Sequence, residues 1–187
     1  MPRFKTIKNP LALWDMEIFI MNEDYQALLY LAEGIKYWNG EGVPCDHMQS
    51  KIWFEKAADL GNEDAIYNLG IGYEYGDFGY VDLAKAFDYY KMAASKGLVT
   101  GMAKTGIFLH IGKGCSQNLE EAFMWFKKAA ERGNVGSMYN LGVCYENGKG
   151  IGRDYSQAAY WYEQAARFNY ENSAVSAARC RYKAQAT

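Results

Sequence analysis

The chain has 187 residues, of which 50% are hydrophobic, 16% aromatic and 22% charged, so it carries enough apolar side chains for a folded core. Its formal net charge is −2 and it contains three prolines, which excludes an extended disordered chain and a strongly basic nucleic-acid or membrane binder. No uninterrupted apolar run approaches the roughly 20 residues of a membrane helix. We therefore expect a partner that is neither nucleic acid nor membrane.

The N-terminal segment begins with a typical helix start, Asn9 followed by Pro10. The apolar stretch Leu11–Met21 follows basic residues and so imitates a secretory signal. Asp15 and Glu17 interrupt that stretch, however, and no small-residue cleavage site follows it. We therefore expect a cytoplasmic protein.

A period of 36 residues runs through the rest of the chain, and such a period indicates an array of repeats. One set of repeated glycines is Gly34, Gly70, Gly106 and Gly142. A second is Gly40, Gly76, Gly112 and Gly148, and a third is Gly61, Gly97 and Gly133, with Asn169 in the fourth place. The same step relates Asp46, Asp82, Asn118 and Asp154. It also relates four Ala-Ala pairs, each preceded by two adjacent aromatic residues.

Residues 62–97 serve as the example of one repeat unit, which contains two helices. The first of them is called helix A. Asn62 is placed to cap it, and Ala65, Leu69 and Tyr73 form an apolar stripe at a spacing of four. Gly70 lies inside the helix, at a cost of up to about 1 kcal/mol relative to alanine. Its recurrence predicts that a neighbouring helix approaches closely at this position.

The second helix, helix B, follows a short loop that starts at Gly76. Asp82 is placed to cap this helix, and Gly97 to end it. The residues predicted to form its buried face are Ala86, Tyr89, Tyr90, Ala93 and Ala94. Large aromatic and small alanine side chains are complementary in packing.

The ends of the array are predicted to be half-units. Shifted by 36, Ile18 and Met21 align with Phe54 and Ala57, so residues 10–22 are interpreted as a degenerate helix B. Residues 171–184 match helix A of a fifth unit. Its basic residues are expected to keep the outer side of this terminal helix soluble; they are Arg179, Arg181 and Lys183.

The runs Tyr67–Tyr73, Tyr139–Tyr145 and Ala158–Ala166 resemble the consensus of Sel1-like repeats, a branch of the tetratricopeptide superfamily, and the resemblance covers about residues 25–182. Local departures are Ser50, Leu109 and the turn Asp77-Phe78-Gly79. The resemblance implies an all-α fold, a right-handed α-solenoid of helix–turn–helix repeats. The predicted segments are a capping helix at 1–24, repeats at 25–61, 62–97, 98–133 and 134–169, and a C-terminal capping half-repeat at 170–187.

Catalytic, cofactor and metal sites are not predicted. His47 and His110 are far apart in the sequence, and no cysteine spacing suggests zinc. The tripeptide Lys104-Thr105-Gly106 matches a motif of penicillin-recognising enzymes, but the accompanying Ser-x-x-Lys and Ser-Asp-Asn motifs are absent. Cys144 and Cys180 lie one period apart, and whether they are close enough to pair stays open.

A partner is expected at the helix-A positions outside the apolar stripe, because A helices line the concave side of such arrays. Aliphatic members of this set, such as Ile35, Ile71, Ile107 and Val143, lie either in this groove or between helices. The predicted partner-binding residues are Leu31, Trp38, Asp64, Tyr67, Glu74, Tyr75, His110, Tyr139, Glu146 and Asn147. With aromatic residues and an acidic fringe, this groove suits a partner offering apolar anchors and some Lys or Arg.

The leading hypothesis is a non-catalytic adaptor that binds another protein or peptide. A second is an immunity or inhibitor protein that occludes a toxin or effector, because some small Sel1-like proteins resemble such immunity proteins. A hydrolase acting on cell-wall or β-lactam substrates is a third, although no nucleophile, base or metal site supports it. Self-association through the groove or an uncapped end is also considered.

Overall fold

The computed structural model describes the backbone of residues 10–186 and the side chains of residues 23–186. Within this range the chain forms nine helices and no strand, which confirms the all-α prediction. It divides into two compact units, Met1–Ala65 and Ile66–Thr187. The helices are α1 (Pro10–Asn39), α2 (His47–Asp59), α3 (Glu63–Tyr75), α4 (Leu83–Lys96), α5 (Val99–Ile111), α6 (Leu119–Glu131), α7 (Val135–Asn147), α8 (Tyr155–Ala166) and α9 (Ser173–Gln185).

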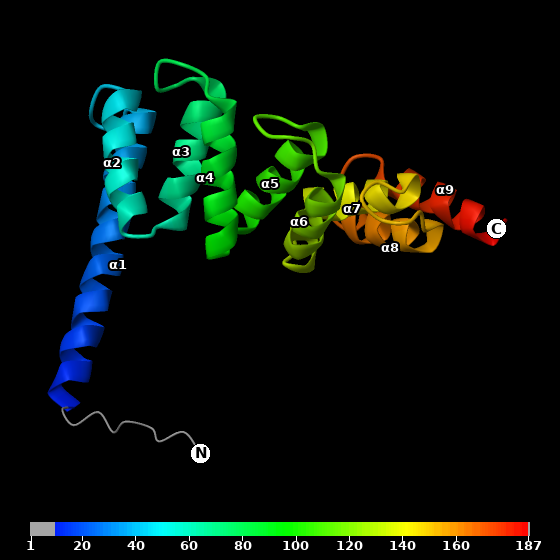
Figure 1. The fold of residues 1–187 in the computed structure, drawn as a ribbon, viewed down its shortest axis with the longest axis horizontal. Coiled ribbons are helices and arrows are strands. Elements are labelled where there is room, and N and C mark those ends of the chain that lie inside the picture. Colours follow the sequence, from blue (N-terminus) through cyan, green and yellow to red (C-terminus); the bar gives the residue numbers. More distant parts are fainter. Residues whose placement is uncertain (1–9, 187) are drawn as a thin grey trace. The chain divides into compact units, whose positions relative to one another are not determined.

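The first unit consists of α1, α2 and the first turn of α3, and α1 and α2 pack side by side (Figure 1). The predicted start at Pro10 is found, but the expected boundary between residues 24 and 25 lies inside one continuous helix of 30 residues. Neither glycine nor proline occurs between Pro10 and Gly34, so no residue there breaks the helix. The side chains of Ile18 and Met21, which were aligned with helix B, lie outside the described residues.

The second unit continues from α3 to α9, and from α4 onward each helix packs against the next one in the sequence (Figure 1). In the described range the helices with odd numbers correspond to helix A and those with even numbers to helix B. The last of them, α9, packs on α8 as the predicted half-repeat. Because each helix from α4 onward packs against the next one in the sequence, most contacts lie within a repeat or between neighbouring repeats.

The helix ends follow the predicted capping residues. Asp82, at the start of α4, accepts a hydrogen bond from the backbone N–H of Lys85 at 2.9 Å. The equivalent bonds run from Gln49 to Asp46, from Glu121 to Asn118 and from Gln157 to Asp154. At the other end of helix B, Gly97 has a φ of 109°, and Asn169 holds the equivalent left-handed position with a φ of 53°.

The helix-A glycines allow the close approach that their recurrence predicted. A Cβ atom on Gly70 would lie 2.7 Å from the Tyr90 ring, and one on Gly106 would lie 2.7 Å from the Phe126 ring. The same arrangement joins Gly142 to Tyr162 in the second unit and Gly34 to Phe54 in the first. Each glycine therefore meets the aromatic residue 20 positions later, and this contact sets how helix B lies on helix A.

Candidate functional site

The predicted partner-binding residues have very different environments. Tyr75, Asn147 and Asp64 are exposed. Leu31, Trp38, Tyr67, His110 and Tyr139 are half-buried, whereas Glu74 and Glu146 are buried. The helix-A positions thus divide into an outer set that a partner can reach and an inner set that packs between helices.

Glu74, at the end of α3, is the centre of a polar cluster. Tyr90 of α4 donates to its Oε2 at 2.6 Å, and Lys104 of α5 donates to the same oxygen at 2.9 Å. Lys113, in the loop after α5, donates to Oε1 at 2.7 Å. Burial alone would raise the pKa of the Glu74 carboxyl, but the bonds from Lys113, Tyr90 and Lys104 together lower it below its usual value.

Glu146, two repeats later at the end of α7, is the centre of an equivalent cluster. Tyr162 of α8 donates to its Oε2 at 3.1 Å, and Arg179 of α9 binds both carboxylate oxygens, at 3.0 and 2.8 Å. Lys183 donates to Oε1 at 3.2 Å. Burial opposes ionisation of Glu146 as well, yet the bonds from Arg179, Lys183 and Tyr162 lower the pKa of its carboxyl.

Ion pairs in the structure correct two expectations from the sequence. Glu74 and Glu146 do not form a free acidic fringe. The two residues are only 8% and 9% exposed, and each carboxylate contacts two cations. Arg179 and Lys183 hold their helix through ion pairs with Glu146, and do not serve only as solubilising charges. Arg181 is likewise paired, with Glu163 at 2.6 Å.

Sequence reasoning missed the cations because each cluster draws its partners from the following repeat. Arg179 and Lys183 are in fact equivalent to Val143 and Asn147, two predicted groove positions, once the period is carried into α9. A further signal was available. A tyrosine stands 16 residues after each glutamate and donates a hydrogen bond to it. Where the glutamate is replaced by Trp38 or His110, the residue 16 positions later is a phenylalanine, which has no hydroxyl.

His110 occupies the position between the two glutamates, one period from each. Its ring lies 6.1 Å from the Phe126 ring, and its Nδ1 is buried without a hydrogen-bond partner in the described part of the chain. Burial, and then the charge of Lys149, lower the pKa of His110. Lys149 is the equivalent of Lys113, but its charge acts on an imidazole, whereas Lys113 donates a hydrogen bond to a carboxylate.

Two of the predicted tyrosines contribute mainly to packing. Tyr67 lies 5.2 Å from the Tyr90 ring, and burial followed by the charge of Glu74 raises the pKa of Tyr67. Tyr139 lies 5.3 Å from the Tyr162 ring, and burial raises its pKa too. These rings cover the buried hydroxyls that donate to Glu74 and Glu146.

An apolar surface remains accessible beside the Glu74 cluster. Tyr75 is 65% exposed, and Lys104 of α5 lies 5.9 Å from its ring centre. Ile107 and Ile111 follow Lys104 at helical spacing and are 38% and 57% exposed. We refer to Tyr75, Lys104, Ile107 and Ile111 as the A-helix surface.

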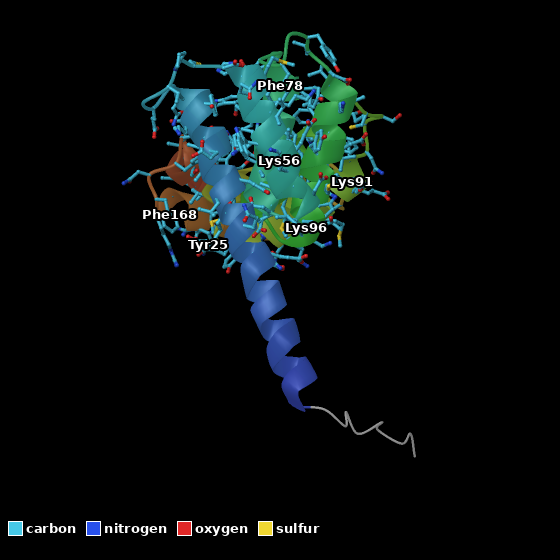
Figure 2. All side chains as sticks on the ribbon, turned by 90° about the vertical axis from the view of Figure 1, so that its left-hand side faces the viewer. Tyr25, Lys56, Phe78, Lys91, Lys96 and Phe168 are labelled. Carbon is cyan, nitrogen blue, oxygen red and sulfur yellow. The ribbon has the colours of Figure 1, made fainter. Side chains whose placement is uncertain are left out.

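In the first unit, Trp38 stacks on His47 with ring centres 4.6 Å apart. Part of the ring face of this predicted binding residue is therefore covered by another side chain of the same protein. Tyr25 of α1 is 62% exposed. Lys56 of α2 extends over the Trp53 ring at 3.9 Å. Figure 2 shows where Tyr25 and Lys56 lie on this unit. Asp64 lies beside a surface pocket that includes Asp24 and Leu28 of α1. Ile35, whose burial was open, is 39% exposed.

A pocket of about 450 Å³ that the sequence did not reveal lies at the C-terminal ends of α4 and α6. Its lining includes Lys96, Lys128, Arg132 and Trp125. Arg132 donates to the carbonyl of Gly97 at 3.0 Å, and Lys128 lies 4.5 Å from the Trp125 ring. These cations stabilise helix C-termini, which carry partial negative charge.

The residues considered for chemistry are engaged in the fold. Lys104 is bound to Glu74, and the Thr105 hydroxyl donates to the carbonyl of Gly101 inside the helix. Cys144 and Cys180 are buried free thiols, and burial raises the pKa of Cys144 to about 11. Among the described residues, no three His, Cys, Asp or Glu side chains are grouped as a metal site, and no helix is both long and apolar enough to span a bilayer.

The Sel1 repeat family model matches residues 26–62, 63–98, 99–134 and 135–167. Each matched segment begins one residue after the start predicted from the 36-residue period. A search of curated proteins finds no match.

Solved structures of similar proteins are also found. A protective antigen of uropathogenic Escherichia coli strains with an SLR fold is 35% identical, with a TM-score of 0.80 over 83% of this chain and 33% of that one. A Sel1 repeat protein from Oxalobacter formigenes is 29% identical, with a TM-score of 0.76 over 85% of this chain and 64% of that one. This chain therefore spans less than two thirds of either protein. The cysteine rich protein B of Helicobacter pylori shares the fold, at 24% identity and a TM-score of 0.53 over 66% of this chain and 92% of that one.

Proposed function

Because this chain belongs to the Sel1 repeat family, whose members generally mediate protein–protein interaction, we propose that it is a non-catalytic module that binds a partner protein through its A helices. The observation that carries this proposal is the A-helix surface. Tyr75, Ile107 and Ile111 expose apolar area on two consecutive A helices, next to the cations of the Glu74 cluster. Interface cores are enriched in aromatic anchors such as Tyr75 and are surrounded by a polar rim.

The Glu74 cluster beside this surface supports a binding role because it joins the helices that carry the surface. Glu74 joins α3, α4 and α5 through Tyr90, Lys104 and the neighbouring loop. A partner therefore meets side chains that are already ordered, which reduces the entropy lost on binding. Free thiols throughout the described range further support our proposal that the protein acts in a reducing, cytoplasmic compartment.

The test is a comparison of two double variants in affinity capture followed by mass spectrometry. Tyr75→Ala with Ile111→Ala removes exposed apolar area from the A helices. Met92→Ala with Met124→Ala removes similar exposed area from the B helices α4 and α6, where these methionines are 47% and 52% exposed. We expect a captured partner to be lost with the first pair and kept with the second. The opposite result would place the binding surface on the B helices.

A further inference from the structure

The ends of α3, α5 and α7 carry Glu74, His110 and Glu146 at equivalent positions. At Glu74 and Glu146 the chain supplies a carboxylate, and two cations surround it. At the position between them the chain supplies His110, while a lysine equivalent to Lys113 is retained as Lys149. The site at His110 thus keeps the lysine of the Glu74 site without its carboxylate.

The polar groups at His110 have no internal acceptor. Lys149 is exposed and forms no ion pair within the described range. Nδ1 of His110 is buried and unpartnered, so the lone pair belongs there and the ring proton belongs on Nε2, because a buried unpaired N–H is rarely tolerated. An ammonium group and an imidazole N–H are therefore both available as donors.

The surrounding charge favours an anion. Lys104 and Lys113 pair with Glu74, and Arg179 and Lys183 pair with Glu146, so each carboxylate meets two cations. Lys149 adds a further positive charge that acts on His110. Lys104 and His110 share helix α5 with the exposed Ile107 and Ile111. A ligand that matches both features has carboxylates next to apolar side chains.

We infer that the partner is an acidic peptide segment, and that one of its Asp or Glu side chains binds between Lys149 and His110, completing the carboxylate row formed by Glu74 and Glu146. This inference rests on the proposed function and assigns the chemistry of its partner. A side-chain carboxylate is favoured because the two filled positions show a glutamate carboxylate held by a cation of the following repeat. A carboxylate between two donors forms charge-assisted hydrogen bonds.

Nuclear magnetic resonance can report on this site directly, because the sequence contains two histidines. His110 lies at the site, and His47 stacks on Trp38 in the first unit and serves as the internal control. The probe is a capped peptide of alternating Glu and Leu residues, and the neutral control is the same peptide with Gln in place of Glu. We expect a saturable shift of the His110 ring signal with the Glu peptide alone, and no shift of His47.

Matched variants distinguish a built site from general attraction. Lys149→Ala is expected to weaken binding of the Glu peptide by about tenfold, while Lys127→Ala, which removes an exposed lysine from α6, leaves it unchanged. His110→Glu combined with Phe126→Tyr recreates the filled site inside the chain, and should abolish binding without unfolding the protein, as circular dichroism would verify.

Several results would overturn the inference. These are the absence of a saturable His110 shift, equal binding of the Gln peptide, equal weakening by Lys149→Ala and Lys127→Ala, or a stronger response to a short single-stranded oligonucleotide, which would assign the site to phosphate. In each case the proposed function would still stand if capture of a partner continued to depend on Tyr75 and Ile111. Loss of that dependence, by contrast, would refute the proposed function itself.

Discussion

Glu74 and His110 occupy the same position in consecutive repeats, yet most of the polar groups around them differ. The glutamate is followed 16 residues later by a tyrosine whose hydroxyl it binds, and the histidine by a phenylalanine with no hydroxyl. A lysine follows each of them, paired in one repeat and unpaired in the other. One fold position thus carries an internally satisfied carboxylate in one repeat, and in the next it carries the imidazole at which we propose that a partner's carboxylate binds.

Among the substitutions that test this comparison, Glu74→Ala is expected to have the largest effect on stability. Removing the carboxylate leaves the Tyr90 hydroxyl, Lys104 and Lys113 without their shared acceptor, so we expect a loss of about 3 kcal/mol in the free energy of unfolding. Chemical denaturation measures this change. Glu131→Ala, which removes an exposed carboxylate on α6, is the control and should cost no more than about 0.5 kcal/mol. Equal losses would show that the Glu74 cluster adds nothing beyond net charge.

Acid should produce a smaller loss, because protonation keeps the side chain in place. The pKa values of Glu74 and Glu146 are lowered in the folded protein, so the unfolded chain binds more protons and stability falls as pH drops below the ordinary glutamate value of 4.5. Thermal unfolding between about pH 6 and about pH 3 measures this effect. In the double variant Glu74→Gln with Glu146→Gln, the slope of melting temperature against pH should be shallower. An unchanged slope would contradict the assignment.

The paired and unpaired lysines should respond differently to the same change. Lys113→Ala removes a 2.7 Å ion pair with a buried carboxylate and is expected to cost about 1.5 kcal/mol in the free energy of unfolding. Lys149→Ala should cost less than about 0.5 kcal/mol, because no carboxylate depends on it. Urea denaturation of the two variants makes the comparison. A larger loss for Lys149→Ala would mean that Lys149 has an internal structural role.

The smallest effect is expected for the hydroxyl alone. Tyr90→Phe removes one of three donors to Glu74 and should lower the free energy of unfolding by about 1 kcal/mol. The reciprocal change, Phe126→Tyr, adds a hydroxyl beside His110 and should bring no gain, since no carboxylate is present there. Denaturation of both variants measures the pair. A stabilising Phe126→Tyr would show that the hydroxyl acts independently of its partner.

The fold was largely predictable because its signals repeat locally. Asp82 and Asn118 cap their helices as their spacing predicted, and Gly70 and Gly106 admit the rings of Tyr90 and Phe126. The boundary near residue 24 was not predictable from alignment to another repeat. Whether a helix ends there depends on a breaking residue, and α1 contains none at that point.

The candidate site was predicted less well, for a physical reason. A single repeat shows that Glu74 lies at the end of helix A, but its orientation depends on Lys104 and Lys113, which lie 30 and 39 residues later. Attraction between separated charges is not visible in a pattern of helical periodicity. Comparing Glu–Tyr with His–Phe at a fixed spacing would have revealed the pairing.

The polar clusters also affect which lengths of chain can be deleted or duplicated without breaking ion pairs. Backbone and glycine contacts repeat every 36 residues, but Glu74 takes two cations from the next repeat, and that repeat replaces the glutamate with histidine. Deleting or duplicating 36 residues would keep the helices in register and mismatch the charges. A deletion of the 72 residues that follow Glu74 would instead give this glutamate the sequence that follows Glu146, with a tyrosine 16 residues later and two cations in the next repeat. Removing two repeats at that point therefore keeps the charges matched, whereas removing one does not.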